Sequence, residues 1–251
     1  MADHALFTAL VELADDHGVL GHRLSEWCGH APMLEEDLAL TNMALDVIGT
    51  ARGLYAHAAA VEGEGRSEDD LAYLRVEREY RNCLLVERPN GDFAQTMLRQ
   101  LYFAAFMQPF WSAALKSTDE TLRGIAGKAV KEMAYHLRHA GEWVIRLGDG
   151  TPGSAARMRA AVEGLHIYTG ELFTASESAA HCSRAGLLPD RAALRDAWLE
   201  NIAPVFAQAM LEMPEGGYPQ TGGRDGLHGE ALGHMLSDMQ YLQRAFPGAT
   251  W

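Results

Sequence analysis

Long uninterrupted hydrophobic runs are missing from this chain of 251 residues. Polar residues interrupt every apolar stretch after a few positions, so no segment offers the roughly 20 apolar residues that cross a bilayer. The opening residues, MADHALFT, have neither the basic start nor the continuous apolar stretch of a secretory signal. We therefore expect a cytoplasmic protein that does not span a membrane.

Cysteine and positive charge are both scarce. The three cysteines, Cys28, Cys83 and Cys182, are odd in number and far apart, which fits free thiols and gives no zinc-site spacing. Lys and Arg number 21 against 34 Asp and Glu, a formal net charge of −13. Such a charge argues against binding to nucleic acid or to an anionic membrane surface.

Common catalytic motifs are absent as well. The sequence contains no Gly-x-Ser-x-Gly elbow, no P-loop and no Gly-x-Gly-x-x-Gly fingerprint. Cys182 follows His181 directly, but neighbouring residues on a helix point in different directions and do not form a nucleophile–base pair.

What the chain does contain is helical periodicity. Leu6, Leu10, Leu13, Leu20 and Leu24 recur at steps typical of one helix face, and no segment alternates with the period of a strand. The predicted helices span residues 6–27, 35–61, 69–85, 93–116, 118–148, 154–178, 190–213 and 227–246. The prediction is an all-α, ferritin-like long antiparallel helix bundle with additional C-terminal helices, forming a single domain over residues 1–251.

One helix carries residues typical of a metal site. Ferritin-like di-iron bundles take one Glu from each of two helices and a Glu-x-x-His pair from each of two others. Here Glu132 and His136 lie one turn apart, while Tyr135 occupies the position three after Glu132. The preceding helix, 93–116, has no Asp, Glu or His at all. The ligand set is therefore incomplete, and a buried polar pair is the preferred interpretation.

Acid-x-x-His also occurs at Glu163–His166 and Asp225–His228. With 34 acidic residues and 11 histidines, chance alone gives about as many matches. The second pair also lies in a glycine-rich loop, which is a poor platform for preorganised ligands. Neither pair is interpreted as a site.

A cluster of arginines stands out in so acidic a chain. Its members fall within one stretch of fourteen residues: Arg75, Arg78, Arg81 and Arg88. On a helix the first three share a stripe that could bind phosphates or an acidic partner, or a solvated face paired with Glu77 and Glu79. The nearby Tyr80 and Asn82 favour a contact with a ligand or with another subunit.

Several segments together resemble the PaaC-type subunits of the phenylacetate-catabolism ferritin-like family. They are RLSEWCGHAP (23–32), EDLALTN (36–42), LLVERPNGDFA (84–94), KEMAYHLRH (131–139), RLGDGT (146–151) and MQYLQR (239–244). Their order and spacing cover nearly the whole chain.

The resemblance implies a non-catalytic structural subunit of a multicomponent phenylacetyl-CoA ring epoxidase. A related subunit of the same fold, of the PaaA type, carries the di-iron centre, and other subunits complete the complex. NADPH supplies electrons through a reductase with flavin and an iron–sulfur cluster. No cofactor or metal is then expected on this chain itself.

The resemblance also identifies a degenerate remnant of the metal site. The catalytic relatives carry Asp-Glu-x-Gly-His on the second helix, and the local match here is Asp46-Val47-Ile48-Gly49-Thr50. Val47 and Thr50 stand where iron ligands would be, and neither binds iron usefully. The predicted remnant consists of Asp46, Val47, Thr50, Glu132, Tyr135 and His136.

Two further stretches are implied to lie near bound acyl-CoA or at the shared interface. The first comprises Arg78, Glu79, Tyr80, Arg81 and Asn82, and the second comprises Ala180, His181 and Cys182. Arg81 is the only one with an obvious rationale for phosphate binding.

Two alternatives stay open. One is a true di-iron oxygenase with an unorthodox ligand set: Glu12 or Asp16, Glu132, His136 and His139. The other is an iron-storage or ligand-binding bundle. For a partner surface, the candidates are the Trp251 tail and the aromatic helix segment Tyr102–Trp111, although core packing is the preferred interpretation of the latter.

Overall fold

The computed structural model describes residues 2–216 and 218–249, and all regular elements in this part are helices. The all-α prediction is confirmed. The α-helices are α1 (Ala2–Ser25), α2 (Leu34–Glu62), α3 (Glu68–Tyr73), α4 (Leu84–Glu87), α5 (Phe93–Ala114), α6 (Glu120–Gly148), α7 (Pro152–Leu165), α8 (Glu177–Arg184), α9 (Arg195–Gln208), α10 (Glu230–Met239) and α11 (Tyr241–Ala245). None of these helices combines the length and apolar character that crossing a bilayer requires.

Side-chain caps set the starts of the two central helices. Asp92 accepts a hydrogen bond from the backbone N–H of Gln95 (2.9 Å), so α5 begins at Phe93. Asp119 does the same for Leu122 (2.9 Å) at the start of α6. Both carboxylates also lie at the positive end of a helix dipole.

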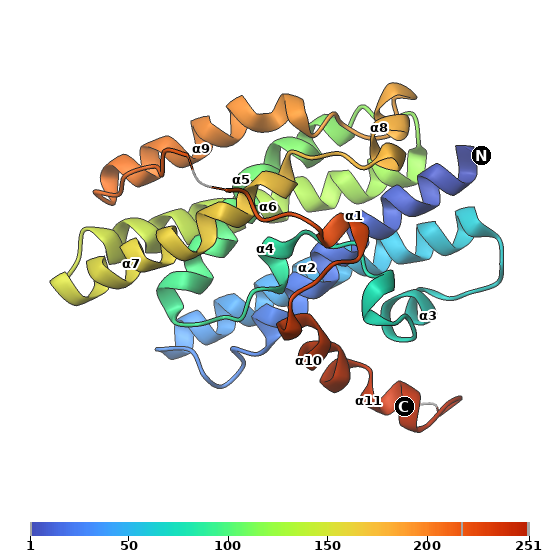
Figure 1. Ribbon diagram of the computed structural model, residues 1–251, viewed down its shortest axis with the longest axis horizontal. Helices are drawn as coiled ribbons and strands as arrows, with labels where there is room; N and C mark the ends of the chain where they lie inside the picture. The colour runs from blue at the N-terminus through green and yellow to red at the C-terminus, as the bar shows by residue number, and fades with distance from the viewer. Residues whose placement is uncertain (1, 217, 250–251) are drawn as a thin grey trace.

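The long helices α1, α2, α5 and α6 form the body of the molecule (Figure 1). α1 packs along α2, α5 packs along α6, and α2 also contacts α6. α7 and α9 cover α5 and α6, while α8 packs on α1. α9 lies along one edge of the molecule, and α10 and α11 lie at the opposite edge (Figure 1).

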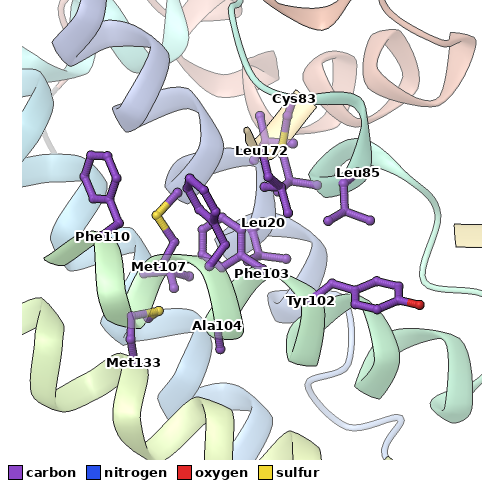
Figure 2. Close-up of a cluster of buried hydrophobic side chains, with 14 of the residues drawn as sticks. Leu20, Cys83, Leu85, Tyr102, Phe103, Ala104, Met107, Phe110, Met133 and Leu172 are labelled. Atoms are coloured by element: carbon purple, nitrogen blue, oxygen red, sulfur yellow. The ribbon is translucent and has the colours of Figure 1, made fainter. Parts of the chain in front are cut away.

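α5 is the core of the bundle, as its apolar composition predicts. Phe103, Met107 and Phe110 point into a cluster that Leu20 of α1 and Met133 of α6 complete (Figure 2). The interpretation of the Tyr102–Trp111 segment as core is confirmed, because both of these residues are fully buried. Trp251 lies outside the described residues.

The predicted helix over 69–85 is wrong, because acidic side chains from other elements bind its backbone. α3 ends at Tyr73, and a short 3₁₀ turn (Glu77–Glu79) precedes α4. The backbone N–H of Arg81 donates to Asp15 (2.7 Å), and that of Cys83 donates to Asp16 (2.8 Å). These carboxylates replace the helix hydrogen bonds of residues 76–83.

Two later boundaries also differ from the prediction. The helix expected over 154–178 ends as an α-helix at Leu165 and continues as a 3₁₀ turn (His166–Leu172), before α8 starts separately. The helix expected over 227–246 begins at Glu230 and is divided into α10 and α11.

Arg75 is not part of an arginine stripe. It is buried and forms a salt bridge with Asp15 on α1, and its guanidinium lies 4.2 Å from the centre of the Tyr80 ring. Tyr55 of α2 donates to the same carboxylate. The stripe interpretation fails here because no continuous helix carries these residues.

A second buried ion pair attaches the C-terminal segment to α1. Arg224, in the 3₁₀ turn Gly223–Asp225, donates to both oxygens of Asp16, at 2.9 and 2.7 Å. Arg191 lies 3.6 Å from the same carboxylate. Burial alone would raise the pKa of Asp16, but the two arginines hold it below its ordinary value. Asp16 is therefore ionised inside the protein.

Two more buried carboxylates hold the same segment. Glu171 accepts hydrogen bonds from the backbone N–H groups of Gly222 (2.7 Å) and Gly223 (2.9 Å). A side chain at Gly223 would collide with the carbonyl oxygen of Asn82, so this close approach requires glycine. Glu87 accepts from the N–H of Gly229 (2.7 Å). The glycine-rich loop is thereby built into the structure.

We predict that Arg224→Ala destabilises the protein by about 3–5 kcal/mol, because it leaves Asp16 buried without its main partner. Chemical denaturation at pH 7 measures the free energy of unfolding. Arg78→Ala, at an exposed position, is the control and should change it by less than about 0.5 kcal/mol. Equal effects of the two substitutions would contradict the assignment.

Acid should also destabilise the fold through His17. This imidazole is fully buried beside Phe103 and Trp111, and burial lowers its pKa to about 4. The unfolded chain binds that proton near pH 6.5, so stability is complete above this pH and is lost as the pH falls toward 4. The slope attributable to His17 is at most about 1.4 kcal/mol per pH unit. Denaturation between pH 4.5 and 6.5 should show a shallower slope in His17→Phe than in wild type or Phe103→Leu; an unchanged slope would refute the prediction.

Candidate functional site

A small polar cluster lies between α2, α5 and α6, inside otherwise apolar packing. His136 of α6 is fully buried. Its Nε2 lies 3.2 Å from Asp46 Oδ2 on α2, and its Nδ1 lies 2.9 Å from Gln100 Nε2 on α5. Three helices are thus joined through one imidazole, with the helix that lacks acids and histidines contributing a neutral amide.

The hydrogen-bond partners fix the protonation of this imidazole. The Gln100 amide donates to Nδ1, so Nδ1 is an acceptor and the proton resides on Nε2, which donates to Asp46. Burial lowers the pKa of His136, and the contact with Asp46 only partly opposes this. The histidine is therefore neutral at pH 7, with both of its nitrogens engaged.

Glu132 lies one turn before His136 on α6 and faces a cation. Its Oε1 accepts from Lys128 Nζ at 3.1 Å, and its side chain is only 13% exposed. Burial raises the pKa of this carboxyl, while Lys128 opposes the shift. The ammonium group of Lys128 supplies the positive charge beside the carboxylate.

The remaining members of the predicted remnant do not add metal ligands. Val47 and Thr50 of α2 are buried, as expected for positions that face the bundle interior. Tyr135, in contrast, is 38% exposed and points away from the interior. The structure therefore brings together Asp46, Glu132 and His136 but not Tyr135.

The donors at this place do not fit a di-iron centre. Such a centre takes four carboxylates and two histidines from four helices. Here the one buried imidazole has both nitrogens occupied, and Lys128 occupies one side of Glu132. Across residues 2–216 and 218–249, no three His, Cys, Asp or Glu side chains gather in a way that could hold a metal ion.

The unorthodox ligand set is not assembled either. Asp16 is bound to Arg224. Burial raises the pKa of Glu12, and the charge of Arg224 is the main influence that opposes this shift. His139 pairs with Glu36 of α2 at 2.9 Å. These groups are separately partnered and do not converge on Glu132 and His136.

Residues 78–82 cross α1 as an irregular segment with mixed exposure. Arg78 and Glu79 are exposed, whereas Tyr80 and Asn82 are buried. Asn82 donates to Glu87 at 2.9 Å. The half-buried guanidinium of Arg81 donates to the backbone carbonyl oxygens of Arg78 (2.6 Å) and Tyr80 (2.8 Å). In this conformation, Arg78 presents the more accessible cation.

A pocket of about 90 Å³ opens next to this segment, between α1, α2 and α3. Tyr80 lines it together with Tyr55 and His22. Burial lowers the pKa of His22 to about 4, so this wall is uncharged at pH 7. Arg52 and Glu68, which also line the pocket, form an ion pair at 3.2 Å.

The second predicted stretch lies on α8, which packs against α1. His181 is exposed, Ala180 is half-buried and Cys182 is fully buried. Burial, and then the charge of Glu12, raises the pKa of the Cys182 thiol to about 11. The thiol is therefore protonated at neutral pH, so it cannot act as a nucleophile paired with His181.

Sequence reasoning missed Gln100 and Lys128, which complete the polar cluster. A search for metal ligands passes over both residue types. One signal was available: a glutamine and an arginine, Arg99, lie in the middle of an otherwise apolar helix, where a buried polar residue needs a partner. His228 was also missed as a structural residue; it contacts Glu87 at 2.7 Å.

We predict that Gln100→Glu raises the pKa of His136 above its ordinary value of about 6.5, since the imidazole would then lie between two carboxylates. In the wild type, the pKa lies below that value. NMR titration of the ring signals measures both, and Gln100→Leu, which introduces no charge, should not raise the pKa. A His136 that titrates identically in Gln100→Glu and wild type would contradict the geometry.

Comparisons with known proteins agree with the resemblance predicted from the sequence. A model of the family described as phenylacetic acid catabolic protein matches residues 1–251. The C subunit of 1,2-phenylacetyl-CoA epoxidase from Escherichia coli (strain K12) is 45% identical over 241 residues, which are 96% of this chain and 97% of that protein. The chain therefore belongs to the phenylacetic acid catabolic protein family.

Proposed function

We propose that this chain is a non-catalytic structural subunit of a phenylacetyl-CoA epoxidase complex. In this proposal it docks on the PaaA-type di-iron subunit, stabilises it and helps to place the acyl-CoA substrate. The observation that carries the proposal is the 45% identity to the C subunit of such an epoxidase, over nearly the full length of both chains.

The polar cluster supports a structural role. A chain of hydrogen bonds links Asp46, His136 and Gln100, and Lys128 balances the charge of Glu132. Buried polar groups that are paired in this way hold helices in one register, whereas unpaired groups would cost stability. The iron and its reaction with dioxygen would then belong to the catalytic subunit, with NADPH, flavin and iron–sulfur chemistry in a separate reductase.

The exposed members of the two predicted contact stretches are the ones suited to a ligand. Arg78 offers an accessible guanidinium for a phosphate group, and His181 is exposed on α8. Tyr80, Asn82 and Cys182 are buried, so their proposed role is to shape these surfaces from inside.

Co-expression with a PaaA-type subunit tests the proposal. We expect the two chains to co-elute, with iron present in the complex and absent from this chain purified alone. A complex containing His136→Asn should keep its iron and its turnover of phenylacetyl-CoA, because the imidazole has a structural role only. The matched variant in the catalytic subunit, with one iron-ligating His replaced, should lose both.

Two results would contradict the proposal. The first is stoichiometric iron in this chain alone that His136→Asn removes, with the variant still folded by circular dichroism. The second is the absence of any complex with the PaaA-type subunit.

A further inference from the structure

The solvent-facing side of α2 has an unusually narrow and regular composition. From Leu38 onward, the exposed residues of this helix are Leu38, Asn42, Leu45, Gly49, Arg52, Ala56 and Ala60. They follow one another at steps of four, three, four, three, four and four. We refer to these seven residues as the outer seam of α2.

The outer seam is poor in charge for a solvent-exposed surface. Arg52 is its only ionisable member, although the chain carries 34 acidic residues. Leu38 and Leu45 are 56% and 62% exposed. Leucines in this arrangement gain nothing from water, and a row of them on one helix face indicates a partner surface.

The spacing indicates the shape of that partner. From Leu38 to Arg52 the steps alternate between four and three residues, a mean period of about 3.5, which is the pattern of helices that pack lengthwise against one another. From Leu38 to Ala60 the seam extends over about 33 Å of helix. At Gly49, only Lys128 Nζ lies within 4 Å of the place where a side chain would begin, so another helix can approach closely there.

Positive charge flanks the seam. Lys128 of α6 lies beside Gly49, and Lys131 and Arg138 are exposed on the same helix. Among the described residues, no carboxylate pairs with Lys131 or Arg138. In a chain with a net charge of −13, this surface therefore fits a helix that carries acidic residues beside an apolar stripe.

We infer that the outer seam of α2 docks a long helix of the PaaA-type subunit, with acidic residues facing Arg52, Lys131 and Arg138. This inference rests on the proposed function and adds the surface through which it operates. A second copy of this chain fits less well. Parallel pairing would oppose Arg52 to Arg52, and antiparallel pairing would bring α6 against α6, so that cations meet cations.

The test compares two variants in binding to the purified PaaA-type subunit. Leu38→Glu/Leu45→Glu should weaken the complex roughly tenfold or more, because it places carboxylates in the centre of an apolar contact. Leu199→Glu on α9 is the matched control; this leucine is 37% exposed, and α9 makes no contact with the seam. Both variants change only exposed positions, so thermal unfolding should show them as stable as wild type.

Each outcome is decisive. A double variant that binds as tightly as wild type, or a Leu199→Glu variant that loses binding equally, overturns the docking surface while leaving the proposed function intact. A wild-type chain that fails to bind the catalytic subunit overturns the proposed function. If sedimentation shows that wild type dimerises with itself and the double variant does not, the seam pairs two copies and the inferred occupant is wrong.

Discussion

Two neighbouring carboxylates in α1, Asp15 and Asp16, hold together segments that are far apart in the sequence. Asp15 binds Arg75 and the backbone of Arg81, while Asp16 binds Arg224. The path of residues 74–83 and the position of the glycine-rich loop both depend on these contacts. Buried ion pairs often add little net stability over apolar packing, but losing one partner is costly, so they specify a single arrangement.

Much of the helical framework was predictable, because its signals are local. Asp92 and Asp119 mark the starts of α5 and α6, and the apolar composition of α5 predicts its burial. The helix predicted over 69–85 failed for a non-local reason: the hydrogen bonds of that backbone go to α1, about 65 residues earlier. Likewise, Gln100 is a neutral amide, and only the fold shows that it faces His136.

The central cluster connects this framework to function. In a ferritin-like bundle, the interior between α2, α5 and α6 is where charged ligands and metal would balance one another. In this chain the balance comes from Lys128 beside Glu132 and from a neutral His136 between an amide and a carboxylate. The interior thus remains polar and paired without a metal, while the outer seam of α2 offers the apolar surface that a subunit needs.

Anomalous X-ray scattering at the iron edge, from crystals of this chain bound to its PaaA-type partner, tests the central claim most directly. The account predicts iron peaks inside the partner bundle and none between α2, α5 and α6, where Lys128 and Gln100 should keep their contacts with Glu132 and His136. An iron peak beside Glu132 and His136 would contradict the account.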